Sequence, residues 1–126
     1  MTFKDSKAYS GFAVPDLAVA KAFYGQTLGI EVAETPERGL ELHLADGNTA
    51  FVYPKPDFIP ATYTILNFPV TDIDAAVDEL VAAGVEIHRY PGLEADERGI
   101  ARDPRGPAIA WFTDPAGKIL SVIQDA

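Results

Sequence analysis

The chain has no cysteine among its 126 residues, so disulfide bonds, thiolate catalysis and cysteine-based zinc sites are excluded. Serine is scarce as well, and none of Ser6, Ser10 and Ser121 lies in a nucleophile elbow. The glycines at predicted turns lack the spacing of a phosphate-binding loop. The common motifs for serine or cysteine catalysis and for nucleotide binding are therefore missing.

Long apolar runs are missing too. No run approaches the roughly 20 apolar residues that a membrane-spanning helix needs. The first residues do not begin a signal peptide. We therefore expect a cytoplasmic protein without a membrane partner.

Basic residues are outnumbered, with 10 lysines and arginines against 19 acidic residues, which gives a net charge of −9. This charge opposes binding to nucleic acid and favours a cationic partner electrostatically. The simpler interpretation is that the acidity maintains solubility. The charge therefore excludes one class of partner without naming another.

The length and composition are those of one globular domain spanning residues 1–126. The hydrophobic content is 48% and the charged content is 23%, which is ordinary for a globular protein. A chain of this length can bury a core without disulfides or metals.

The first half of the chain predicts a strand, a helix and three further strands. Phe12 and Val14 alternate onto one face of the first strand, Asp16 can cap the helix, and Gly29 can end it. The predicted elements span residues 9–14, 17–28, 29–32, 40–45 and 49–53. A connector with three prolines, residues 54–60, cannot continue a sheet and separates this module, residues 8–54, from the rest.

The second half, residues 61–124, repeats the same order of elements. Asp72 can cap a helix that ends at Gly84, and a hairpin closes the chain at the turn of residues 114–117. The predicted elements span residues 63–70, 73–81, 84–87, 108–113 and 118–124. A charged segment rich in glycine and proline, residues 90–107, is interpreted as a loop that either covers a pocket or is simply solvated.

The two halves can be aligned residue by residue. Phe12 matches Phe68 at an offset of 68 − 12 = 56, and Gly47 matches Gly117 at an offset of 117 − 47 = 70. The larger offset indicates an insertion, which falls in residues 90–107. We therefore predict an α+β fold of two tandem βαβββ modules.

Four short motifs accompany the repeat: Val-Pro-Asp-Leu at residues 14–17, Phe-Tyr at 23–24, Leu-Gly at 28–29 and Asp-Pro-Ala-Gly at 114–117. With the repeat, they resemble the vicinal oxygen chelate superfamily, which includes glyoxalase I, bleomycin resistance proteins and extradiol dioxygenases. The resemblance covers nearly the whole chain and implies that the two modules form curved mixed sheets around a cleft. It does not imply one activity, because one scaffold of this kind hosts many.

Enzymes of that superfamily hold a divalent metal with His, Gln or Glu from the first and last strands of each module. The resemblance places these ligands at Tyr9, Phe51, Ile65 and Ser121. None of these side chains is an imidazole, carboxylate or amide donor, so we expect no metal and no other cofactor.

The two histidines offer an alternative metal site. His43 and His88 each follow a glutamate by two residues, so Glu41 and Glu86 would share a strand face with them. Two histidines and two glutamates suit zinc. The same alternation is typical of the solvent side of a half-buried strand, which is the interpretation we favour.

The matched positions predict the lining of a small-molecule site. We predict an aromatic and apolar pocket in which Asn67 and Ser121 orient the ligand, with Trp111 or Phe112 as a stacking face. The predicted ligand-binding residues are Tyr9, Phe51, Tyr53, Tyr63, Ile65, Asn67, Trp111 and Ser121. Aromatic residues in such places also pack cores.

Three functions follow as hypotheses. The first is a metal-free protein that binds a small organic molecule, cationic or aromatic, as bleomycin resistance proteins do. The second is an enzyme, either a glyoxalase-like lyase or isomerase or a dioxygenase, and the third is a non-catalytic interaction module. The resemblance implies a homodimer in each case, in which the connector could let two chains exchange modules.

Overall fold

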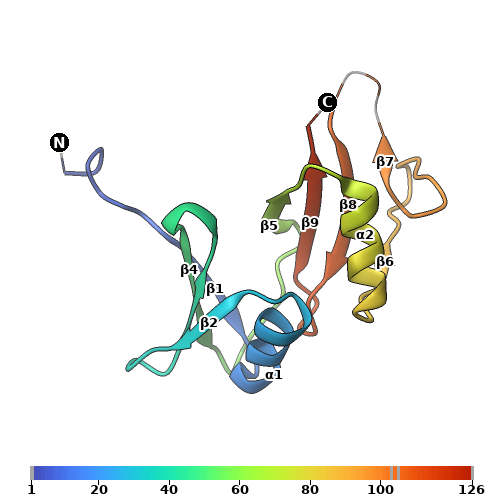
Figure 1. Ribbon diagram of the computed structural model, residues 1–126. Coiled ribbons are helices and arrows are strands. Elements are labelled where there is room, and N and C mark those ends of the chain that lie inside the picture. The colour runs from blue at the N-terminus through green and yellow to red at the C-terminus, as the bar shows by residue number, and fades with distance from the viewer. Residues whose placement is uncertain (1, 103, 105, 126) are drawn as a thin grey trace. The chain divides into compact units, whose positions relative to one another are not determined.

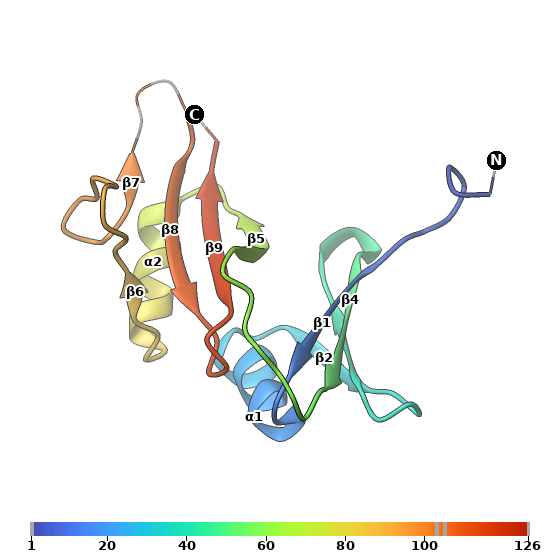
Figure 2. The same cartoon turned by 180° about the vertical axis from the view of Figure 1, so that it is seen from behind.

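The computed structural model describes residues 2–102, 104 and 106–125, which form two compact units, Met1–Phe58 and Ile59–Ala126. Each unit contains one mixed sheet and one α-helix (Figures 1 and 2), and the first unit has two further helical segments. The α+β class and the two tandem modules are therefore confirmed. Each unit is described by itself below.

Unit 1 contains a four-stranded sheet in the order β1-β4-β3-β2. β1 and β4 are parallel, and the other pairs are antiparallel. The strands are β1 (Ser10–Val14), β2 (Glu31–Glu34), β3 (Leu40–His43) and β4 (Thr49–Pro54), and the helical segments are α1 (Leu17–Lys21), η1 (Ala22–Thr27) and η2 (Ala45–Gly47).

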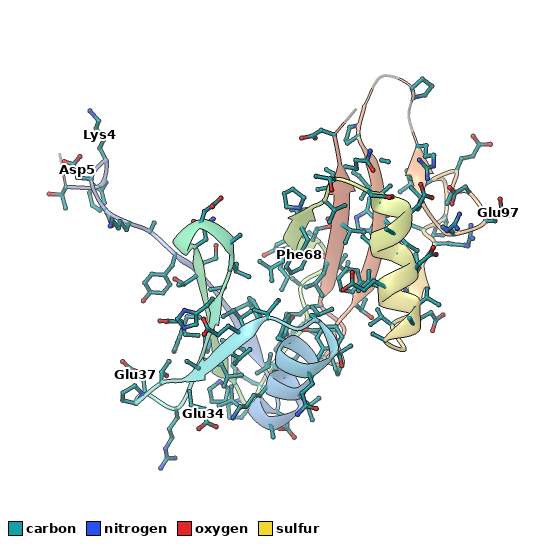
Figure 3. The ribbon with its side chains drawn as sticks, in the orientation of Figure 1. Lys4, Asp5, Glu34, Glu37, Phe68 and Glu97 are labelled. Carbon is teal, nitrogen blue, oxygen red and sulfur yellow. The ribbon has the colours of Figure 1, made fainter. Side chains whose placement is uncertain are left out.

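Alternation along the strands of unit 1 separates a buried face from an exposed one. The buried side chains of the sheet pack with those of the helical segment, so the core lies on the helix side. The buried residues are Phe12, Val14, Ala20, Phe23, Tyr24, Leu40, Leu42, Ala50 and Val52. Acidic side chains such as Glu34 and Glu37 project from β2 and the turn after it (Figure 3).

The helix of unit 1 begins as predicted and ends in an unexpected way. The Asp16 carboxylate accepts hydrogen bonds from the amides of Ala18 and Val19, which caps α1. The helix then widens into the π-helical segment η1, in which the Leu28 amide donates to the Phe23 carbonyl. The Ile30 amide donates to the Tyr24 carbonyl and so still belongs to the end of the helix. β2 therefore starts at Glu31 rather than at residue 29.

Unit 2 contains a five-stranded sheet in the order β5-β9-β8-β6, with β7 also paired to β8. β5 and β9 are parallel, and β8 and β9 form the predicted antiparallel hairpin. The elements are β5 (Thr64–Pro69), α2 (Ile73–Ala82), β6 (Ile87–His88), β7 (Ala101–Arg102), β8 (Ala108–Thr113) and β9 (Ile119–Gln124).

Helix α2 covers one face of this sheet (Figures 1 and 2). Asp72 accepts a hydrogen bond from the Ala75 amide as the predicted cap, and the Ile73 amide donates to Gln124 Oε1 at 2.8 Å, which fastens the helix to β9. The apolar side of α2 packs on the sheet and completes the core of this unit. The buried apolar residues are Ile73, Val77, Leu80, Val85, Ile100, Ala110, Phe112, Leu120 and Val122.

Two predictions for unit 2 are wrong. The predicted strand at residues 84–87 begins only at Ile87, because the Val85 amide donates to the Leu80 carbonyl and still belongs to the helix end. The predicted loop of residues 90–107 contains β7 and the fully buried Ile100. Neither feature has a periodic signal, because both elements are too short to show one.

The segment before β7 is fastened to α2 by ion pairs. Arg98 contacts Asp78 at 3.0 Å, and Arg102 contacts both Asp74 at 2.8 Å and Asp96 at 3.0 Å. Glu97 projects from the same segment (Figure 3). These contacts fasten Arg98 and Arg102 to α2.

Candidate functional site

The alternation of β8 decides which aromatic ring lies on which face of the unit 2 sheet. Phe112 is 1% exposed and belongs to the core under α2, together with the fully buried Ala110. Trp111 lies between them in sequence, so its side chain points to the face away from α2. Of the two candidates for a stacking face, Trp111 is therefore the one that lies on the face away from α2.

Four side chains form a cross-strand row on this face. His88 of β6 is paired with Trp111 of β8, Trp111 with Ser121 of β9, and Ser121 with Asn67 of β5. Paired residues of neighbouring strands point to the same side of a sheet. The cross-strand row His88–Trp111–Ser121–Asn67 thus brings three of the predicted site residues together with one histidine.

Hydrogen bonds and a ring contact fix the members of the row. The Ser121 hydroxyl donates to Asn67 Oδ1 at 2.6 Å, and His88 Nε2 lies 3.2 Å from Thr113 Oγ1. The Tyr90 ring meets the Trp111 ring edge to face, with centroids 5.6 Å apart. The indole is therefore held in position from the side.

Sequence reasoning named His88 only as part of an alternative metal site, and it did not name Thr113 or Tyr90. His88 was assigned to a solvated strand face, because the pairing of β6 with β8 cannot be read from residues 87–88 alone. Thr113 could have been found, since it lies two residues after Trp111 on the same strand and so on the same face.

The remaining predicted residues of unit 2 lie outside the row. Tyr63 precedes β5 and is 69% exposed. Ile65 falls at the register shift between Thr64 and Leu66, so it has no paired residue on β9.

Unit 1 presents its own aromatic surface on the face away from α1. The Phe51 and Tyr53 rings of β4 are stacked, with centroids 6.0 Å apart and planes at 20°. Phe51 is paired with Gly11 and Tyr53 with Ala13 of β1, and Tyr53 is 39% exposed. Tyr9 precedes β1 and is 68% exposed.

Next to these rings, β3 and β2 carry the predicted histidine and glutamate pair. His43 Nε2 lies 3.0 Å from Glu41 Oε1, and Nδ1 lies 3.8 Å from Glu31 Oε2. The prediction that Glu41 and His43 share a face is confirmed. All three side chains are more than a third exposed, as on a solvated strand face.

A match to a known family decides the identity of the fold. The sequence model of the Glyoxalase/Bleomycin resistance protein/Dioxygenase superfamily matches residues 8–120. The chain belongs to the glyoxalase/bleomycin resistance/dioxygenase superfamily. Among curated proteins, none matches the sequence significantly.

Solved structures of superfamily members share the fold over almost the whole chain. TnmS3, an antibiotic binding protein from Streptomyces sp. CB03234, is 25% identical with a TM-score of 0.72, covering 97% of this chain and 98% of its own. The fosfomycin resistance protein FosX from Listeria monocytogenes is 15% identical with a TM-score of 0.73, and the match covers 97% of this chain and 94% of FosX. A glyoxalase family protein from Bacillus anthracis is 21% identical with a TM-score of 0.69, and the match covers 96% of this chain and 97% of that protein.

The superfamily's metal site does not fit the side chains of this member. Ser121 donates its hydroxyl to Asn67, and Tyr9, Phe51 and Ile65 offer no imidazole or carboxylate. Within residues 2–102, 104 and 106–125, no three histidine, aspartate or glutamate side chains are grouped to hold a metal ion. Of the alternative set of two histidines and two glutamates, Glu41 and His43 belong to unit 1, and Glu86 and His88 belong to unit 2.

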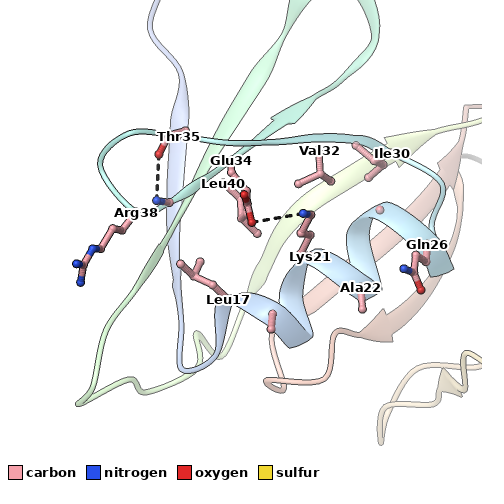
Figure 4. A pocket seen from close by; sticks show the side chains of 13 residues that line it. Leu17, Lys21, Ala22, Gln26, Ile30, Val32, Glu34, Thr35, Arg38 and Leu40 are labelled. Carbon is pink, nitrogen blue, oxygen red and sulfur yellow. Dashed lines mark hydrogen bonds and ion pairs between the residues drawn. The ribbon is translucent and has the colours of Figure 1, made fainter.

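This superfamily member also has a groove of about 910 Å³ within unit 1, between the helical segment and β2 (Figure 4). Leu17, Val32 and Leu40 form part of its apolar lining, and the 3.4 Å ion pair between Lys21 and Glu34 spans it (Figure 4). The groove lies on the helix side of the sheet, so it is separate from the face of Phe51 and Tyr53. In the described part of the chain, no helix is long and apolar enough to span a membrane.

Proposed function

We propose that this superfamily member binds a small organic molecule without using a metal ion. The observation that carries the proposal is the 2.6 Å hydrogen bond from Ser121 to Asn67. At the last-strand position where the resemblance expects a metal-ligating glutamate, this chain has a hydroxyl that is 0% exposed and donates to a neighbouring amide. The exposed Asn67 amide and the Trp111 indole lie on the same face of the sheet and suit hydrogen bonding and ring stacking with an organic ligand.

Aromatic rings on both sheets support a cationic or aromatic ligand. Trp111 in unit 2 offers a face on which flat rings stack, and the Phe51–Tyr53 stack in unit 1 offers rings on which organic cations also bind. The net charge of −9 favours a cation over an anion. The similarity to an antibiotic binding protein over 98% of that chain supports the same class of function.

A thermal-shift screen with aromatic and cationic antibiotics tests the proposal. A ligand present at 100 times its Kd stabilises the folded state by about 2.7 kcal/mol, which raises Tm by several degrees. We expect the Trp111→Ala variant to lose this shift. The Phe3→Ala variant, which removes an aromatic ring that is 88% exposed on the N-terminal arm, should keep it.

The opposite outcome points to the enzyme hypotheses. If no compound stabilises the protein while one divalent metal per chain does, and a chelator removes an isomerase or dioxygenase activity, the metal-free proposal is wrong. We further propose that the protein works as a homodimer, for which the resemblance is the support.

A further inference from the structure

The inference drawn here rests on the proposed function and names the class of ligand for unit 2. We propose that the cross-strand row takes an uncharged, planar molecule of at least two aromatic rings, with a hydrogen-bonding group at each end. His88 and Asn67 would bind the two ends, and Trp111 would stack on the rings between them.

The polar groups of the row lie at its two ends. At one end His88 uses Nε2 for Thr113, which leaves Nδ1 without a partner among the residues that the structure describes. At the other end Asn67 is exposed and accepts from Ser121 through Oδ1, which leaves its amide N–H groups to donate. Each end therefore has a hydrogen-bonding group to offer a ligand.

The middle of the row is suited to a flat apolar body. Trp111 is half-buried and held by Tyr90, and the Ser121 hydroxyl is already satisfied by Asn67. Ile109 and Ile123 flank the row on one side and Ile119 on the other, as the pairing of β8 with β9 shows. A ring stacked on the indole would therefore meet apolar neighbours on either side.

The spacing of the strands sets the length of the ligand. Neighbouring strands lie about 4.8 Å apart, and β6 and β5 are three spacings apart, so the ends of the row are separated by about 14 Å. One aromatic ring is too short to meet both ends. Two linked or fused rings with a polar substituent at each end have a comparable length.

The chemistry of the row also favours an uncharged ligand. It contains an imidazole, an indole, a hydroxyl and an amide, but no carboxylate, ammonium or guanidinium group. A charged group buried against the row would lose water without gaining an ion pair. The cationic ligands that the overall charge permits are therefore disfavoured at this face.

Three related probes test the inference by calorimetry: 4,4′-dihydroxybiphenyl, 4-hydroxybiphenyl and the cation 4-(aminomethyl)biphenyl. Trp111 is the only tryptophan of the chain, so a change in its emission locates the binding at the row. We expect the dihydroxy probe to bind about three- to tenfold more tightly than the monohydroxy probe, the effect of one added hydrogen bond, and the cation to bind more weakly than the dihydroxy probe.

The chain supplies matched control variants, because it has two histidines and two asparagines. The advantage of the dihydroxy probe should disappear in His88→Ala and in Asn67→Ala. It should persist in His43→Ala and in Asn48→Ala, which change the same residue types in unit 1. If His88→Ala unfolds the protein, His88→Phe keeps a planar ring and removes the hydrogen-bonding nitrogen atoms.

The failures of the two proposals can be told apart. If no aromatic compound binds or changes the Trp111 emission, the proposed function fails at this face. If the probes bind but the dihydroxy advantage persists in both row variants, or if the cation binds most tightly, the proposed function stands and the present inference is wrong.

Discussion

At Gly39, just before β3, the backbone lies very close to β4. A Cβ atom at this position would lie 2.5 Å from Phe51 Cε1 and 2.7 Å from the Val52 carbonyl oxygen. The ring could move, but the backbone oxygen belongs to β4 and cannot move without disturbing its pairing. Only glycine therefore fits beside this strand.

We expect the Gly39→Ala variant to lose about 1–3 kcal/mol of unfolding free energy, the usual effect of overpacking. Gly25→Ala is the control, since its Cβ would make an ordinary 3.5 Å contact with Val32. Urea unfolding measures both variants through the midpoint concentration. Equal midpoints for Gly39→Ala and the unmodified protein would show that β4 can shift without loss.

Individual residues also show what could be read from the sequence. Asp16 and Asp72 were predicted as helix caps, and both are, because a cap depends only on residues within one turn. The burial of Phe12 and Val14 followed from alternation. His88 could not be placed, because its role depends on pairing with Trp111, 23 residues away.

At the level of elements, the segment before β7 is organised by Asp96. Burial raises the pKa of its carboxyl, but the hydrogen bonds donated by the Ile100 amide, the Arg102 guanidinium and the Arg98 amide outweigh burial and lower the pKa below its ordinary value. Arg102 keeps its charge, since the hydrogen bonds that it donates to Asp96 and Asp74 raise its pKa.

This shift predicts a pH dependence of stability. The pKa of Asp96 is lower in the folded than in the unfolded state, so its ionised carboxylate stabilises the folded protein. This stabilisation is fully present above the unfolded pKa, about 3.9, and is lost as the pH falls through the folded pKa. The Asp96→Asn variant should be less stable by about 0.5–1 kcal/mol at neutral pH, and the difference should shrink in acid.

Urea unfolding at a series of pH values measures the effect. Glu97→Gln is the neighbouring control, because within the described part of the chain Glu97 is contacted only at its backbone carbonyl, which accepts a hydrogen bond from Arg89. A difference between Asp96→Asn and the unmodified protein that stays constant down to low pH would contradict the assignment.

Elements that the sequence did not reveal are those held by contacts rather than by periodicity. The hairpin of β8 and β9 was predicted, since its strands are six residues each around an Asp-Pro-Ala-Gly turn. β7 has two residues and exists because it pairs with β8. The groove beside β2 was also missed, because it arises from the packing of α1 and η1 against the sheet.

For the whole molecule, the strand pairing reproduces the internal repeat. Phe12 is paired with Val52 in unit 1, and Phe68 with Val122 in unit 2, which gives the offsets 68 − 12 = 56 and 122 − 52 = 70 found in the sequence. The repeat could be recognised in the sequence because it recurs in apolar residues on the core-facing sides of the strands. The pairing between β6 and β8 has no such signal.

The association of whole chains is a separate prediction. We expect sedimentation equilibrium to give twice the 13.6 kDa mass of one chain, with a dissociation that depends on protein concentration. A monomer at every concentration tested would contradict the homodimer proposal. It would leave the row in unit 2 unaffected, since all four residues belong to one unit.

The repeat gives every position of the row a counterpart in unit 1. The paired residues there are Ala33, Glu41, Phe51 and Gly11, where unit 2 has His88, Trp111, Ser121 and Asn67. All eight positions lie on the faces away from the helices, so mutations there do not change the residues that pack beneath α1 or α2. A duplicated scaffold of this kind can evolve new recognition in one copy while the other keeps its own, through a few point mutations at a time.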